Sequence, residues 1–416
     1  DVERMYIGIL KRYDWPNPYL SSASGKSTQV TGANGVKMTG PYDWVPPSYW
    51  LADTAHGGAF GFNTETSPGA AVPPIESMRR MLPAADIWPI DSVWAYHAAG
   101  GQFKHSHRFE QALAARYGKP TSAADYTFKA QLMTYEGERA MFEAYRRNAY
   151  ISTGLIQWML TNAWPSTFWH LVDYYLRPGG GYFGAKKALE PVHVQYSYDD
   201  RSIVVVNGTH ARVPGLRVQA RVLSADATEK FSRDMSIDLP ADTTVRLFTI
   251  PGAAELKLPA DPATYFVALR LQDAHGRTVS RNLYWLSTHP DLLDRDSTTW
   301  YVTPVQQYAD YTALRTLPKA RVQTSAHFAR HGAWEDATVT LSNPGRSIAF
   351  FMRLQLTRGA GGEEVLPVLW EDNYVTLLPG ETRAISARVR VKDLRGAKPA
   401  VHVEGWNVEG TEASVR

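Results

Sequence analysis

The sequence predicts an α/β segment at residues 1–190, followed by two β-sandwiches at residues 191–288 and 319–416. Three observations lead to this organisation. Helix-like and strand-like patterns alternate up to Pro191, which is typical of α/β folds. Beyond that proline, short β-type runs separated by turn residues take over, with the spacing of a sandwich. A polar stretch at residues 289–318 contains three prolines and divides these runs into two sets, so it is predicted to be a connector.

The first predicted elements are a helix and a short strand. Apolar residues at spacings of three and four between Val2 and Tyr13 predict an amphipathic helix, with Asp1 as a candidate cap. Residues 19–23 are predicted to form a strand, which makes half of an α/β repeat. Residues 25–56 are irregular and rich in Gly, Pro and aromatic residues, and a loop of this length in a compact domain is usually functional.

The stretch GGAFGFNTETSPGAA at residues 57–71 is the centre of the α/β segment. Residues 59–63 are predicted to be a buried strand, followed by the carboxylate of Glu65 and stopped by Pro68 and Gly69. A carboxylate at the carboxyl end of an apolar parallel strand is where a (β/α) barrel carries its catalytic groups. The alternative is a loop glutamate that is solvated or paired with an arginine.

Further helices and one strand are predicted between this stretch and the first sandwich. They are a helix at residues 73–81, a helix that Ser122-x-x-Asp125 opens and that runs to about Asn148, a strand at residues 152–160 and a helix at residues 184–189. On the long helix, Glu136, Glu138 and Arg139 are predicted to form a solvated charged face.

The sandwich strands are predicted from short runs rich in β-branched and aromatic residues, with turn residues such as LLPGE between them. The first sandwich is predicted to contain strands at residues 202–207, 217–223, 244–250, 265–271 and 278–286. The second is predicted to contain strands at residues 321–326, 337–341, 349–356, 374–378, 383–391 and 400–405.

The composition argues against some classes of binding partner and in favour of others. The chain has 44 basic and 41 acidic residues, a formal net charge of +3 and no long run of like charge, so neither nucleic acid nor a membrane is expected as a partner. Cysteine is absent, which excludes disulfide scaffolds and thiol nucleophiles and fits an exported bacterial protein. A periplasmic or secreted location is therefore expected, although the first residues do not form a signal peptide. The 13 Trp, 22 Tyr and 14 Phe make carbohydrate a reasonable ligand class, although core packing accounts for most of them.

Several long motifs, in order, give the chain a family resemblance. They are MTGPYDWVPPSYW at residues 38–50, FNTETSPG at 62–69, GLIQWML at 154–160, YFGAKKALEPVHVQYS at 182–197, RNLYWLST at 281–288 and WEDNYVTLLPGE at 370–381. Through almost its whole length the chain resembles glycoside hydrolase family 2, in the branch of the exo-β-D-glucosaminidases, β-mannosidases and mannosylglycoprotein endo-β-mannosidases. The resemblance implies the C-terminal part of a (β/α)8 TIM barrel followed by two immunoglobulin-like β-sandwiches. An N-terminal segment of the same precursor would complete the barrel.

The resemblance implies roles for Glu65 and Trp158, and the need of an ionised nucleophile for hydrogen-bond donors suggests further site residues. Glu65 matches the family's nucleophile, and Tyr42 is the candidate hydroxyl that contacts it, with core packing as the alternative. Asn63 and Thr66 are candidates to steady the local backbone or a sugar hydroxyl. Trp158 would form part of the floor under the terminal sugar, or else plug the barrel. The remaining candidate substrate-binding residues are Asn162 and Trp164, and for Trp164 a packed turn is the alternative.

The implied activity is that of a retaining, exo-acting β-glycosidase whose acid/base residue lies outside this chain. The expected substrate is an oligosaccharide or glycan with a terminal β-linked mannose, because the WEDNYVTLLPGE ending and the TETSPG variant resemble the β-mannosidase side of the branch. The alternative is chitosan, cut by an exo-β-D-glucosaminidase. No cofactor is expected, because this chemistry needs only carboxyl groups. No metal is expected either, since His97, His105 and His107 lack the accompanying ligands of a metal site. A carbohydrate-binding module without catalysis is the rival reading.

Overall fold

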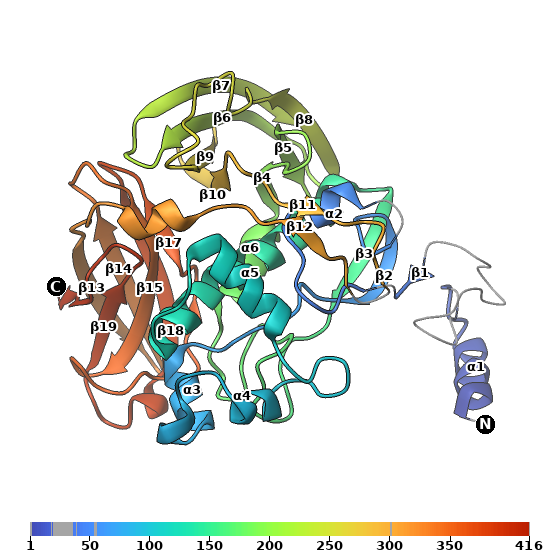
Figure 1. Cartoon of the computed structure of the whole chain (residues 1–416), viewed down its shortest axis with the longest axis horizontal. Helices are drawn as coiled ribbons and strands as arrows, with labels where there is room; N and C mark the ends of the chain where they lie inside the picture. Colours follow the sequence, from blue (N-terminus) through green and yellow to red (C-terminus); the bar gives the residue numbers. More distant parts are fainter. Residues whose placement is uncertain are drawn as a thin grey trace.

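The computed structural model describes residues 2–17, 19, 36–38, 40–53, 56–299 and 302–415. Residues 20–23 of the strand predicted at residues 19–23, and the cap predicted at Asp1, fall outside these residues. Figure 1 shows the two sandwiches on two sides of a group of helices, the first in green to yellow and the second in orange to red. The predicted order, an α/β segment followed by immunoglobulin-like sandwiches, is confirmed.

The α/β segment contains a sheet of three parallel strands in the order β1 (Val36–Lys37), β2 (Gly61–Thr66) and β3 (Ser152–Gln157). Strand β2 begins two residues later than predicted and contains Glu65 instead of ending before it. A Cβ at Gly154 would lie 2.4 Å from the Phe62 ring, so the close pairing of β2 and β3 needs glycine there.

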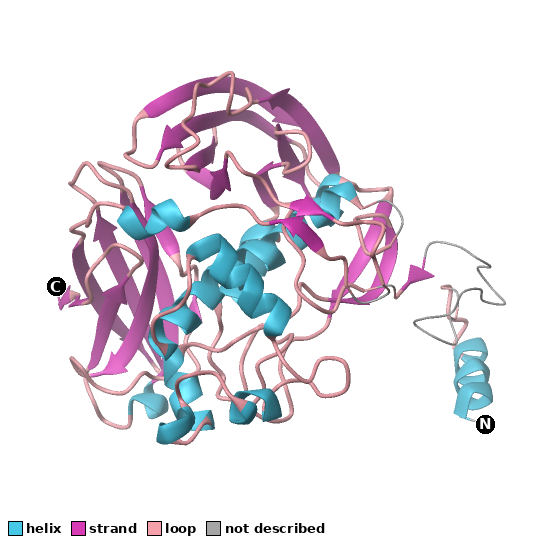
Figure 2. Cartoon of the chain, in the orientation of Figure 1, coloured by secondary structure: helices cyan, strands magenta, loops and turns pink. Residues whose placement is uncertain are grey.

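Some helices lie at the centre of the molecule, between the two sandwiches, and others lie toward its edges, as the cyan ribbons of Figure 2 show. They are α1 (Val2–Arg12), α2 (Tyr49–Ala52), α3 (Ile75–Met81), α4 (Ser92–Tyr96), α5 (His107–Tyr117), α6 (Ala123–Arg147) and α7 (Gly180–Ala188), with the short 3-10 helices η1 (Ala84–Asp86), η2 (Thr312–Thr316) and η3 (Val391–Leu394). Helix α1 stands apart at one end of the molecule and exposes its apolar residues (Figure 1).

Helix α6 is the centre of the helical layer. As predicted, Ser122 caps it, accepting a hydrogen bond from the Asp125 backbone N–H at 3.1 Å. The prediction of a solvated charged face is wrong: Glu136, Glu138 and Arg139 are all buried. Because α7, β3 and the first sandwich pack around this helix, no side of its central turns is left to face water.

The first sandwich joins a sheet in the order β4-β5-β8 to a sheet in the order β10-β9-β6-β7. The strands are β4 (Val192–Tyr196), β5 (Ser202–Asn207), β6 (Val213–Ser224), β7 (Glu229–Leu239), β8 (Thr243–Thr249), β9 (Thr264–Gln272) and β10 (Thr278–Ser287). The prediction omitted β4 and β7, and β7 is a mostly exposed edge strand with many charged residues.

A connector with strands β11 (Leu292–Leu293) and β12 (Val305–Gln307) leads to the second sandwich. Its sheets have the orders β16-β18-β14-β13-β21 and β17-β15-β19-β20. The strands are β13 (Gln323–His331), β14 (Trp334–Ser342), β15 (Ala349–Arg358), β16 (Leu369–Trp370), β17 (Val375–Leu377), β18 (Thr382–Arg390), β19 (Pro399–Glu404), β20 (Thr411–Glu412) and β21 (Ser414–Val415).

One hydrophobic core runs from the α/β segment into the second sandwich. It includes Tyr135 on α6, Trp285 on β10 and Phe351 on β15, so all three parts contribute to it. The Tyr135 and Phe351 rings meet edge to face with centroids 5.6 Å apart, and those of Trp285 and Phe351 with centroids 5.9 Å apart. Within the described residues, no helix has the length and apolar character needed to cross a bilayer.

Candidate active site

Strand β2 and the loop before α2 bring Glu65 and Tyr42 together. The Tyr42 hydroxyl donates to Glu65 Oε1 at 2.9 Å and also lies 3.2 Å from the Glu65 carbonyl oxygen. Glu65 is half-buried, so one side of its carboxylate is held while the group remains within reach of solvent. The geometry therefore presents an oriented carboxylate near the carboxyl end of a parallel strand, where barrel enzymes carry their chemistry.

The phenol of Tyr42 is held as a donor. Burial, and then the hydrogen bond to Glu65, raise the pKa of Tyr42 well above its usual value. Trp169 holds the backbone of Tyr42 in place, because its indole Nε1 donates to the Tyr42 carbonyl oxygen at 2.8 Å. The Trp169 ring also meets the Tyr42 ring edge to face, with centroids 6.3 Å apart. Tyr42 is thus packed in the core and bonded to Glu65 at the same time.

Asn63 and Thr66 support the backbone around this pair. Both are fully buried on β2. Asn63 Nδ2 donates to the Gly40 carbonyl oxygen at 3.4 Å, and the Thr66 hydroxyl donates to the same oxygen at 3.0 Å. These bonds fix the chain just before Tyr42 against β2. The structure places both residues in the backbone-supporting role, and contact with a sugar hydroxyl stays a prediction.

Two indoles near this end of the sheet are partly exposed. Trp158 follows β3 and is 38% exposed, and its backbone N–H donates to the Thr66 carbonyl oxygen at 2.9 Å. Trp164 is 41% exposed and stacks on the His97 ring at 5.5 Å between centroids. Exposed aromatic faces of this kind suit the apolar face of a pyranose. Their contact with substrate stays a prediction.

The side chain of Asn162 contacts residues of its own loop and is buried there. Its Nδ2 donates to the Phe168 carbonyl oxygen at 3.1 Å and lies 2.8 Å from His170 Nδ1. Burial lowers the pKa of His170 to about 4, so the imidazole is neutral near pH 7 and can accept this bond. In this structure Asn162 orders the turn that carries Phe168 and Trp169 behind Tyr42.

The sequence reasoning missed the contribution of Glu138 and Gln157. Gln157, the last residue of β3, donates through Nε2 to Glu138 Oε1 at 3.0 Å and to the Trp169 carbonyl oxygen at 3.1 Å. Burial raises the pKa of Glu138 well above its ordinary value, and the hydrogen bond from Gln157 opposes this only in part. The buried carboxyl of Glu138 on α6 thus supports, through Gln157, the strand end and the tryptophan beside Tyr42.

We expect Glu138→Gln to reduce the loss of stability at rising pH. The folded-state pKa of Glu138 lies above its ordinary value of 4.5, so the stability that it contributes is complete below that value. This stability is lost as the pH rises through the folded-state pKa, whereas glutamine mimics the neutral carboxyl at every pH. Melting temperatures between about pH 5 and pH 9 measure the effect. The exposed Glu409→Gln is the control, and equal pH slopes for wild type and Glu138→Gln would contradict the expectation.

Among the residues that the structure describes, no group of three His, Cys, Asp or Glu side chains could hold a metal ion. The rings of His105 and His107 stack on each other at 3.9 Å between centroids.

Comparisons with known proteins extend this picture. Residues 300–408 match the family model of the exo-β-D-glucosaminidase Ig-fold domain, and residues 199–289 match that of the mannosidase Ig/CBM-like domain. The exo-β-D-glucosaminidase of Streptomyces avermitilis is 43% identical over 98% of this chain and 46% of its own length. The crystal structure of the Amycolatopsis orientalis exo-chitosanase CsxA superimposes with a TM-score of 0.92 at 38% identity, covering 99% of this chain and 50% of that one. The β-D-mannosidase of Dictyoglomus thermophilum shares the fold at 17% identity, with a TM-score of 0.68 over 96% of this chain and 44% of that one.

The chain belongs to the C-terminal region of glycoside hydrolase family 2. Within that family it falls in the branch of the exo-β-D-glucosaminidases and β-mannosidases and carries their immunoglobulin-like domains. The chain spans about half the length of the relatives that it matches.

The predicted preference for mannosides is wrong. The relatives with 34–43% identity over nearly the whole chain are exo-β-D-glucosaminidases, whereas the Aspergillus niger β-mannosidase B is 26% identical over 63% of it. Of the two motifs that favoured mannose, the ending motif WEDNYVTLLPGE at residues 370–381 lies in the second sandwich. There Asp372 pairs with Lys187 at 3.2 Å and with Arg383 at 2.5 Å. It joins parts of the molecule and therefore carries no information about the sugar.

Proposed function

We propose that this chain is the nucleophile-bearing part of a retaining exo-β-D-glucosaminidase, which removes glucosamine from the ends of chitosan oligosaccharides. The observation that carries the proposal is the half-buried Glu65 carboxylate held by Tyr42 at 2.9 Å, in a chain similar to exo-β-D-glucosaminidases over nearly its whole length. The related CsxA has been solved in complex with PNP-β-D-glucosamine, which supports the same choice of sugar here.

In the proposed reaction Glu65 attacks the anomeric carbon while a second carboxyl group, about 5–5.5 Å away in retaining enzymes, protonates the leaving oxygen. The bond between the anomeric carbon and that oxygen breaks as the bond to Glu65 forms. Water, deprotonated by the same second group, then releases the sugar with its β configuration retained. The hydrogen bond from Tyr42 holds one carboxylate oxygen, so that the other is free to attack.

The second carboxyl group is proposed to come from a segment of the same precursor that adds strands to the sheet. Two features support a partner segment. The described sheet has three strands, whereas a closed barrel of this class has eight. Helix α1 also exposes Val2, Met5, Tyr6 and Ile9, the apolar face that a barrel helix turns toward its strands.

Full-length protein incubated with chitosan oligosaccharides tests the function. We expect glucosamine to be released one unit at a time, with the β anomer appearing first in NMR spectra. The aryl β-mannoside serves as the comparison substrate and should turn over much more slowly than the aryl β-glucosaminide. Faster cleavage of the mannoside, or the α anomer as the first product, would overturn the proposal.

We expect Tyr42→Phe to lower kcat without unfolding the protein. Phenylalanine keeps the packing against Trp169 but removes the hydroxyl that holds Glu65. Because a hydrogen bond to a charged group contributes about 1.5–3 kcal/mol, kcat should fall roughly 10- to 100-fold. Steady-state kinetics measure the loss, and an unchanged melting temperature separates it from unfolding. Wild-type kcat in the variant would show that the hydroxyl does not orient the nucleophile.

A further inference from the structure

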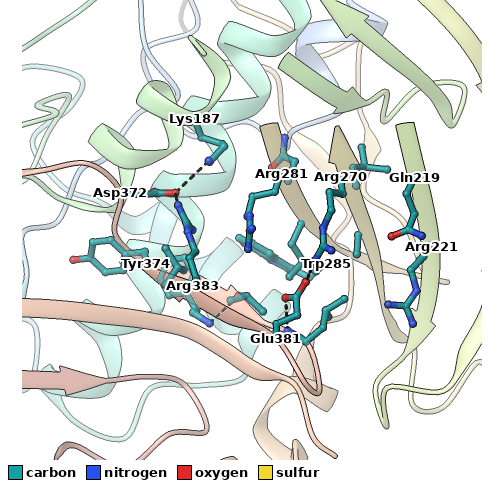
Figure 3. Close-up of a pocket in the computed structure, with 18 of the residues that line it drawn as sticks. Lys187, Gln219, Arg221, Arg270, Arg281, Trp285, Asp372, Tyr374, Glu381 and Arg383 are labelled. Carbon is teal, nitrogen blue, oxygen red and sulfur yellow. Dashed lines mark hydrogen bonds and ion pairs between the residues drawn. The ribbon is translucent and has the colours of Figure 1, made fainter. Parts of the chain in front are cut away.

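A cavity apart from the candidate active site lies where both sandwiches meet helices α6 and α7. Its volume is about 220 Å³, and no residue that lines it belongs to the group around Glu65. Figure 3 shows side chains from β6, β9 and β10 on one side and from the second sandwich on the other. Ligand sites for larger organic molecules usually measure about 300–1,000 Å³, so this cavity suits a small ligand.

Cationic side chains dominate the cavity. Five of them line it together with two carboxylates, and these are Lys187, Arg221, Arg270, Arg281 and Arg383, with Asp372 and Glu381. Asp372 already holds Lys187 and Arg383, and Glu381 pairs with Arg270. The ion pair of Arg221 is with Glu229 on the neighbouring strand. Both carboxylates that line the cavity are therefore paired with cations other than Arg281.

None of the ion pairs described above includes Arg281. Strands β9 and β10 pair antiparallel with Arg281 directly opposite Arg270, a placement of like charges that destabilises a sheet. Among the described residues Arg281 makes no hydrogen bond and no ion pair. Its side chain extends into the cavity between Arg383 and Arg270 (Figure 3). Burial, and then the Arg383 guanidinium, lower the pKa of Arg281 below its usual range.

Neighbouring groups complete a possible set of ligand contacts. Gln219 on β6 stands opposite Arg270 in the register, so Gln219, Arg270 and Arg281 form one row across the sheet. Trp285 and Tyr374 add aromatic walls beside this row. Arg270 is 34% exposed at the rim, which leaves a way in from solvent, whereas Lys187 and Asp372 are buried at the inner end.

We propose that this cavity binds a small oxyanion, a phosphate or the carboxylate of an acidic monosaccharide, with Arg281 as its main ligand. The planar guanidinium offers paired N–H donors to two oxygens of such a group, and the positive surroundings compensate its charge. The walls come from both sandwiches and from the helices. A bound anion therefore bridges the three parts and stabilises their packing by linkage.

The test uses the complete chain and two probes, inorganic phosphate and sodium glucuronate, at constant ionic strength set with chloride. We expect the melting temperature to rise with at least one probe, and calorimetric titration to show saturable binding. Neutral glucose should produce no shift. The probe with the larger effect at equal concentration distinguishes a phosphate site from a site for acidic sugars.

Arg281→Gln should bind the effective probe about tenfold or more weakly, because it loses hydrogen bonds to a charged group. Arg281→Lys keeps the charge but loses the paired donors, so it should bind with intermediate affinity and serves if the glutamine variant does not fold. Arg277→Gln, on the exposed turn between β9 and β10, is the matched control and should respond as the wild type does. A wild type that responds to neither probe would overturn the proposal, as would Arg281 variants with wild-type affinity.

Discussion

Glu65→Gln in the full-length enzyme is expected to lower kcat by about 10⁴-fold or more, as removal of a catalytic nucleophile does in other hydrolases. Glutamine preserves the size of the side chain and can still accept the bond from Tyr42, which spans 2.9 Å in the wild type. It cannot form the glycosyl ester, so the loss should fall on chemistry with little change in folding. The rate of aryl β-glucosaminide hydrolysis and the melting temperature measure the two effects separately.

Added azide sharpens this test. In Glu65→Ala, which opens the space that glutamine fills, a small anion can occupy the position of the carboxylate and attack the anomeric carbon from the same side, so activity should return with an α-glycosyl azide as product. The exposed Glu255→Gln on the first sandwich is the matched control and should retain wild-type kcat. A Glu65→Gln enzyme with near wild-type turnover would exclude Glu65 as the nucleophile.

Arg139→Met is expected to produce the largest loss of stability. The Arg139 guanidinium is fully buried on α6 and reaches into the first sandwich. Its Nη1 donates to Asn282 Oδ1 at 2.8 Å and to the Leu283 carbonyl oxygen at 2.5 Å, and the guanidinium lies 4.1 Å from the Tyr284 ring centroid. Methionine fills similar space but leaves these acceptors buried without a donor. The expected cost is about 1–3 kcal/mol for each of the two acceptors that is left without a donor.

Calorimetry should therefore show a melting temperature several degrees lower for Arg139→Met, and limited proteolysis should cut faster between α6 and the sandwich. Arg277→Met removes the same charge from the exposed surface of the same sandwich. Its effect should stay within about 0.5 kcal/mol of zero. If the two variants melted alike, the buried guanidinium would not be what joins helix and sandwich.

The parts of the fold that local sequence could predict are those governed by local physics. The apolar run of β5 is buried at every position, and the predicted strand matches residues Ser202–Asn207. The side chain of Ser122 begins α6 because capping is decided within one turn. Edge strand β7 escaped prediction because it buries little, so its charged pattern resembles a loop.

The parts that could not be predicted depend on partners distant in sequence. From the local sequence, Glu138 and Arg139 were predicted to be surface residues. Their burial depends on hydrogen-bond partners far away in the sequence, Gln157 for Glu138 and Asn282 for Arg139. The need of an ionised Glu65 for a hydrogen-bond donor indicated Tyr42 as its partner. The hydrogen bond between Asn162 and His170 depends on loop packing, which no motif encodes. The sugar preference was wrong, as the glucosaminidase relatives show, and one of the two motifs taken as evidence for it lies in the second sandwich, where Asp372 pairs with Lys187.

The shared aromatic core has a consequence for anyone who would treat the two sandwiches as exchangeable modules. The rings of Trp285 in the first sandwich and Phe350 in the second meet edge to face, with centroids 5.4 Å apart. The ring centroids of Phe128 on α6 and Trp406 in the second sandwich are 6.2 Å apart. Cutting the chain before the last sandwich would leave these rings facing water. Such a truncated protein would tend to aggregate through these exposed rings. A foreign C-terminal domain could replace the second sandwich only if it supplied an equivalent set of aromatic side chains.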